Sequence, residues 1–212
     1  MGRLLRDLLQ GVPLVLGLVV VGAISGYGFL WLTRLRPLAR RTERWRAMAA
    51  TIGAEVDPQT SRWLTPAMRG VRDGVAFEAV MTPRGKGHVS TVVSVTLDAP
   101  LGVGFLVETF VVELASSARR GQLVRLGKPS IDERARVRAA DPGALHAFVA
   151  RGAGDVIGRF LETMPASWEA SIDDTRVDLV TPGGVSDPAF LRAAIDEAVR
   201  LARELSRIRR AT

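Results

Sequence analysis

The feature that most constrains this chain is an apolar run, Gly11–Thr33, in which 23 consecutive residues carry no charge. As a helix, this run would rise about 34 Å, enough to cross a hydrocarbon core about 30 Å thick. Buried helices of soluble domains rarely stay uncharged over such a length. We therefore predict that residues 1–36 form a short tail and one transmembrane helix.

The C-terminal end of this run has the residues expected at a membrane surface. Tyr27 and Trp31 lie about one turn apart, and amphipathic rings prefer the headgroup level. Pro37 lies just beyond Arg34 and Arg36 and disfavours continuation of the helix. A cleaved signal peptide is the alternative, with Ala23 and Ser25 at a cleavage spacing. Because the residues after Ser25 remain apolar, we favour an uncleaved anchor.

The charge of the chain is concentrated beside the predicted span. The formal net charge is +7, and residues 1–46 hold eight Arg against two acidic residues, Asp7 and Glu43. The remaining residues hold 21 basic and 20 acidic side chains. Non-specific nucleic-acid binding needs a dense basic face, so we expect no nucleic-acid partner.

The distribution of Arg also predicts an orientation. Six Arg follow the span within a short distance, and positive flanks stay on the cytoplasmic side. We therefore expect a single-pass protein of a bacterial inner membrane, with its N-terminus outside and its C-terminal domain in the cytoplasm. The predicted membrane-interface residues are Tyr27, Trp31, Arg34, Arg36, Arg40, Arg41, Arg44 and Trp45.

Residues 37–53 have the pattern of a basic amphipathic helix, with Trp45, Met48, Ala49 and Ile52 on one face. Such a helix can lie on an anionic lipid surface. It can equally be the first helix of the domain, with the same apolar face in the core. The sequence does not distinguish these two interpretations.

Gly22 and Gly26 inside the run have the small-xxx-small spacing that lets two helix backbones approach closely. They indicate a possible homodimer through the transmembrane helix.

Residues 54–212 are predicted to form one soluble α+β domain, an antiparallel sheet of five to seven strands with helices packed on one face. Asp73-Gly74 between two strand-like runs predicts a hairpin within 66–82. Two Asp-Pro pairs, at 141–142 and 187–188, predict helix starts. Further strands are expected at 89–97, 101–112, 131–139, 168–172 and 176–180, and further helices at 155–164 and 188–208. Residues 115–130 are expected to form a loop.

Catalytic and metal-binding patterns are not evident in this sequence. There is no Cys, and the two His, His88 and His146, have no partner at metal-ligand spacing. We therefore expect no cofactor, no metal and a non-enzymatic role.

Several local signatures make residues 44–208 similar to uncharacterised bacterial proteins that have one N-terminal transmembrane helix. They are Arg44-Trp45 with Ala49 and Ile52-Gly53, Gly70-x-x-Asp73-Gly74-x-x-Phe77-Glu78, Gly127-x-Pro129-x-Ile131-Asp132, Ala139-x-Asp141-Pro142 and Asp187-Pro188. The family usually has an aromatic residue at the position of Ile131. The resemblance implies an architecture only, because no activity is established for that group.

Two functions fit these observations. The first is a membrane-anchored interaction domain that binds the lipid bilayer through its anchor and an unidentified protein through its domain. The alternative is a membrane-tethered module that binds a lipid or a small apolar ligand. An apolar cavity above about 300 Å³ would favour the alternative, whereas a packed core with an exposed apolar patch would favour the first.

Overall fold

The structure is a computed structural model that describes residues 22–23, 25–27, 36–57, 67–83, 89–109, 121–165 and 167–211. It divides into two compact units, Met1–Arg44 and Trp45–Thr212. Most of the predicted span, Gly11–Thr33, lies outside the described residues and stays a prediction. Within the described ranges, no helix is both long and apolar enough to cross a membrane.

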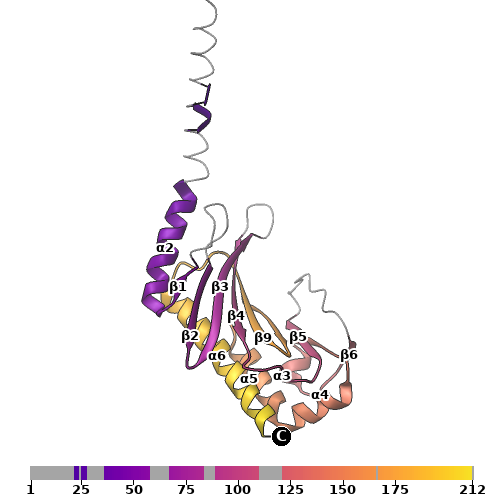
Figure 1. Cartoon of the computed structure of the whole chain (residues 1–212). Helices are drawn as coiled ribbons and strands as arrows, with labels where there is room; N and C mark the ends of the chain where they lie inside the picture. Colours follow the sequence, from indigo (N-terminus) through magenta and orange to yellow (C-terminus); the bar gives the residue numbers. More distant parts are fainter. Residues whose placement is uncertain are drawn as a thin grey trace, which may run out of the picture. The chain divides into compact units, whose positions relative to one another are not determined.

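A single antiparallel sheet forms the centre of the second unit, which confirms the α+β class (Figure 1). Its nine described strands have the order β1-β2-β3-β4-β9-β8-β5-β7-β6. Their bounds are β1 Glu55–Val56, β2 Ala67–Arg72, β3 Val75–Pro83, β4 Val89–Thr96, β5 Phe105–Thr109, β6 Gln122–Val124, β7 Ala135–Ala139, β8 Glu169–Asp173 and β9 Arg176–Pro182. The prediction of five to seven strands was too low because β1 and β6 are too short to show a periodic pattern.

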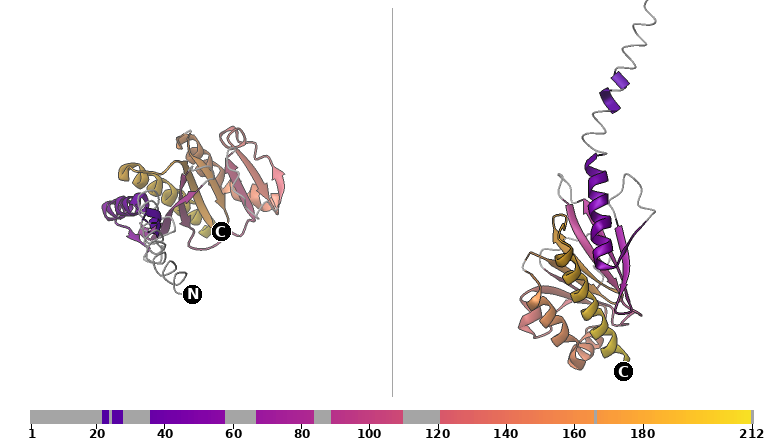
Figure 2. Two further views of the ribbon diagram at one scale, coloured as in Figure 1. Left: turned by 90° about the horizontal axis from the view of Figure 1, so that it is seen from above. Right: turned by 90° about the vertical axis from the view of Figure 1, so that its left-hand side faces the viewer.

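The helices are α2 Arg36–Ile52, α3 Pro129–Asp132, α4 Pro142–Phe148, η2 Val149–Ala153, α5 Gly154–Thr163 and α6 Pro188–Arg210. The long C-terminal helix α6 packs on β2, β3, β4 and β9, and α5 packs on α6. Both views of Figure 2 show α6 running along the sheet. The predicted long C-terminal helix is therefore confirmed.

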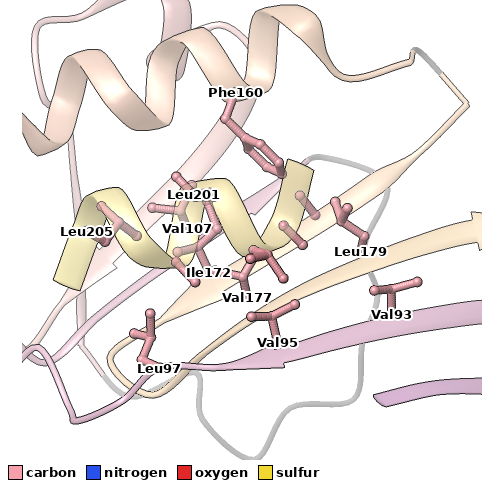
Figure 3. Close-up of a cluster of buried hydrophobic side chains, with 14 of the residues drawn as sticks. Val93, Val95, Leu97, Val107, Phe160, Ile172, Val177, Leu179, Leu201 and Leu205 are labelled. Carbon is pink, nitrogen blue, oxygen red and sulfur yellow. The ribbon is translucent and has the colours of Figure 1, made fainter. Parts of the chain in front are cut away.

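The core lies between the sheet and this helical layer. Figure 3 shows Val93, Val177 and Leu179 from the sheet facing Leu201 of α6 and Phe160 of α5. All five side chains are at most 3% exposed. Because side chains alternate along a strand, the residues between these core residues point to the opposite face of β4, β9 and β8.

That other face has a polar row that crosses the sheet. The strand register aligns Glu78, Ser94, Asp178, Ser171 and Glu108 on neighbouring strands. Asp178, Ser171 and Glu108 are buried, at 5%, 8% and 8% exposure. A buried polar row of this kind restricts the strand register, because a shift by one residue would place these groups on the opposite face.

Three further sequence predictions need correction. Residues 115–130 were expected to form a loop, but Gln122–Val124 form β6, which pairs with β7. The expected strand over 131–139 begins only at Ala135, because Pro129 starts the short helix α3, in which Ile131 is fully buried. Trp45 is not at a membrane surface: it is 1% exposed and belongs to the core with Met48, Ala49 and Ile52. The second half of the helix predicted at 37–53 therefore packs on the domain.

Candidate functional site

The residues predicted to contact the membrane do not form a site that the structure describes. Tyr27 is 65% exposed and Arg44 is exposed, whereas Trp45 is buried. Trp31 and Arg34, and the side chains of Arg36, Arg40 and Arg41, lie outside the described residues. Gly22 and Gly26 have open space around them in this chain, so their dimer role stays a prediction.

The best-formed apolar cavity lies where the end of α5 meets the first turns of α6. Its volume is about 210 Å³, and Phe160, Met164, Leu179, Ala193 and Ala194 are among its lining residues. Phe160 points from α5 toward the sheet, and Leu179 lies on β9 (Figure 3). We call this cavity the apolar pocket.

An aromatic pair forms one wall of the apolar pocket. The rings of Trp168 and Phe190 meet edge to face with centroids 4.8 Å apart and planes at 71°. Trp168 precedes β8 and is 6% exposed, whereas Phe190 lies in the first turn of α6 and is 37% exposed. Edge-to-face pairs of this kind add about 0.5–1.5 kcal/mol beyond the area that they bury.

The same pair borders a second cavity, which we call the polar hollow. Its volume is about 340 Å³, and its other lining residues are Ser167, Thr181, Gly184, Val185, Ser186 and Asp187. It lies between the end of β9 and the N-terminus of α6. The apolar pocket and the polar hollow therefore share Trp168 and Phe190 as a common wall.

Two residues that line the polar hollow each have a buried polar atom with no hydrogen-bond partner among the described residues. The two atoms are Nε1 of Trp168 and Oγ1 of Thr181. An unpaired polar group in the interior costs about 1–3 kcal/mol, so native structures contain few of them. Both atoms are enclosed by protein, so neither is open to a ligand in the polar hollow as the structure stands.

The charged side chains that line the two cavities are acidic, and each already has a partner. Asp187 caps α6, and its carboxylate accepts a hydrogen bond from the Ala189 N–H at 2.9 Å. Glu197 at the apolar pocket is paired with Arg200, and this carboxylate raises the pKa of that guanidinium further above its usual value. No Lys or Arg is among the described residues that line either cavity.

A larger charged hollow of about 730 Å³ lies beside the C-terminal half of α6. Two of the four arginines among its described lining residues are paired with its acids: Arg203 with Asp73 at 3.2 Å and Arg210 with Asp98 at 2.7 Å. In the described part of the chain, no cluster of His, Cys, Asp or Glu is placed to hold a metal ion. The apolar pocket and polar hollow are therefore the stronger candidates.

Sequence reasoning identified the elements around this site but not the site itself. It placed Trp168 at a strand start and Phe190 in the last helix. One signal was available: Phe190 falls outside the apolar stripe of that helix, which runs through Leu191 and Ile195. That position alone did not identify the site, because single exposed apolar residues are common on protein surfaces.

Comparison with known proteins gives little further information. No protein family matches the chain, and no curated protein is similar to it in sequence. Among solved structures, the chain is similar to the crystal structure of the mycobacterial trehalose monomycolate transport factor A, TtfA. The TM-score is 0.48 and the identity 16%, over 82% of this chain and 94% of that chain. A likeness of this size supports no functional argument.

Proposed function

We propose that this chain is a membrane-anchored module that binds the apolar end of an amphiphilic molecule in the apolar pocket. The observation that carries this proposal is the shared aromatic wall of Trp168 and Phe190, with an apolar cavity on one side and a polar one on the other. An amphiphile has the same division between its tail and its head.

The volume of the apolar pocket limits what it can hold. At about 210 Å³ it does not reach the volume of about 300 Å³ that was expected for a ligand-binding module, and it cannot enclose a whole drug-sized ligand. It is larger than an engineered cavity of about 150 Å³ that binds benzene. The pocket therefore suits the end of an alkyl chain, and each methylene buried there contributes about 0.8 kcal/mol.

The predicted anchor would hold the domain beside the bilayer, which would be the source of the ligand. A span at Gly11–Thr33 with the Arg flank at 34–46 would hold the domain near a bilayer, where amphiphiles are concentrated. This part of the proposal rests on the sequence.

The competing role, a domain that binds a protein through an apolar surface, has less support in the described residues. Among the described residues of the second unit, the exposed large apolar side chains are Val71 on β2, Leu123 on β6 and Phe190 on α6. They come from three separate elements, and isolated exposed apolar residues are normal on protein surfaces.

The proposal can be tested by photoaffinity labelling of the full chain in lipid nanodiscs. The probe is a medium-chain fatty acid methyl ester with a diazirine near the end of its chain. We expect labelling, mapped by mass spectrometry, at the lining residues of the apolar pocket, such as Met164 and Phe190. Ala193 is exposed and lines the pocket, so Ala193→Leu should fill it and abolish this labelling.

Ala189→Leu is the matched control, because Ala189 is exposed on the same helix and lines neither cavity. This control should label like the wild type. Labelling spread over the lipid-facing surface, and unchanged by Ala193→Leu, would contradict the proposal.

A further inference from the structure

We infer that the ring of Phe190 sets the length of alkyl chain that the apolar pocket accepts, because this ring closes the pocket off from the polar hollow. This inference rests on the proposed function. It adds the residue that determines specificity for chain length, and it follows from the place of Phe190 in the lining of both cavities.

Phe190 differs in burial from the other large apolar side chains that line the apolar pocket. Phe160, Trp168 and Leu179 are core residues with at most 6% exposure, and Met164 packs against the same core. Phe190 is 37% exposed. Because protein interiors are close-packed, the core side chains cannot give way to a longer ligand, whereas the ring of Phe190 is a wall that a substitution can remove.

The start of α6 holds the backbone on both sides of Phe190 independently of its ring. The Asp187 carboxylate accepts a hydrogen bond from the Ala189 N–H at 2.9 Å, and the Asp187 carbonyl accepts one from the Leu191 N–H at 3.1 Å. The side chain of Leu191 is fully buried. A substitution of Phe190 should therefore change the wall and leave the helix start in place.

The space beyond the ring offers a longer chain further apolar surface. The polar hollow has a volume of about 340 Å³, and one of its lining residues is Val185, which is half-buried and packs against the core. Trp168 lines both cavities, so it borders the route from one to the other. Without the ring of Phe190, an alkyl chain can extend along Trp168 toward Val185. With the ring in place, the chain ends at this wall.

The test is competition against the photoprobe on the full chain in nanodiscs, with a series of methyl esters of increasing chain length. Labelling is read at Met164, which lines the pocket and is present in every variant. For the wild type, we expect the affinity to rise with chain length and then to level off. In Phe190→Ala the affinity should continue to rise beyond the wild-type plateau, about fourfold for each methylene that enters the joined cavity.

Three further variants complete the test. Phe190→Tyr keeps the ring, so its plateau should match that of the wild type. Phe190→Leu keeps an apolar side chain without the ring, so it should also move the plateau to longer chains, and it serves as the test variant if Phe190→Ala does not fold. Leu123→Ala is the control, because Leu123 is 63% exposed on β6 and lines neither cavity. Its plateau should be unchanged.

The outcomes separate this inference from the proposed function. A plateau in the wild type that stays in place, or moves to shorter chains, in the folded Ala or Leu variant would overturn the inference and leave the proposed function intact. A wild type that shows no plateau, or no labelling at Met164, would overturn both.

Discussion

At the scale of single residues, the most unusual group is Asp178 in the polar row of the sheet. Burial raises the pKa of this carboxyl above its usual value, against the lowering effects of a hydrogen bond from Ser94 and of the nearby Arg176. Arg176 Nε lies 3.0 Å from the carboxylate, and Oδ1 has no partner among the described residues. The ionised form is therefore disfavoured in the folded protein.

The raised pKa has a definite consequence for stability. Because the folded state holds the proton more tightly than the unfolded state, Asp178 lowers stability at neutral pH, and this cost fades as the pH falls toward about 4. We expect Asp178→Asn to unfold at a higher temperature than the wild type at neutral pH. The difference should shrink as the pH falls.

Thermal unfolding of the full chain at neutral and mildly acidic pH measures this effect. Asp98→Asn is the control, because Asp98 forms a surface ion pair with Arg210 and such pairs contribute little. A less stable Asp178→Asn at neutral pH would mean that the attraction to Arg176 exceeds the cost of burial.

At the scale of elements, the two Asp-Pro pairs determine where helices begin. Asp141 accepts hydrogen bonds from the N–H groups of Gly143 and Ala144 at 2.8 and 3.1 Å, and Pro142 occupies the first helical position. Asp187 makes the corresponding bond at the start of α6. Both helix starts were predicted from the sequence because capping depends on neighbouring residues alone.

Removal of the Asp141 cap should destabilise the domain. We expect Asp141→Ala to lower the free energy of unfolding by about 1 kcal/mol, and Asp141→Asn to leave it nearly unchanged. Denaturant unfolding of both variants checks this. Equal stability of the Ala variant and the wild type would show that the cap contributes little to α4.

The elements that could be predicted from the sequence are those that depend on a few neighbouring residues. The β2–β3 hairpin follows from Asp73-Gly74, whose φ angles of 50° and 81° are those of a tight hairpin turn. Trp45 was ambiguous because an amphipathic helix has the same pattern on lipid and on a protein core. The site was not predicted, since Trp168 and Phe190 meet only after β8 and α6 are placed by the whole sheet.

At the scale of the whole molecule, a predicted anchor precedes a domain with a proposed amphiphile-binding site. The Arg-rich flank predicts that the domain is cytoplasmic. A reporter that is active only in the cytoplasm, fused after Thr212, should therefore give signal. Silence of that fusion together with activity of a periplasmic reporter would reverse the orientation and leave the binding site unaffected.

The central claim is that the apolar pocket binds the end of an alkyl chain, and the most direct measurement is the affinity of methyl esters that differ only in chain length. Competition for labelling of the apolar pocket in the full chain should strengthen about fourfold with each methylene until the pocket is full, and then level off. In Ala193→Leu the plateau should come at shorter chains. An affinity that rises steadily with chain length, and equally in Ala193→Leu, would reflect partition into the bilayer and contradict the account.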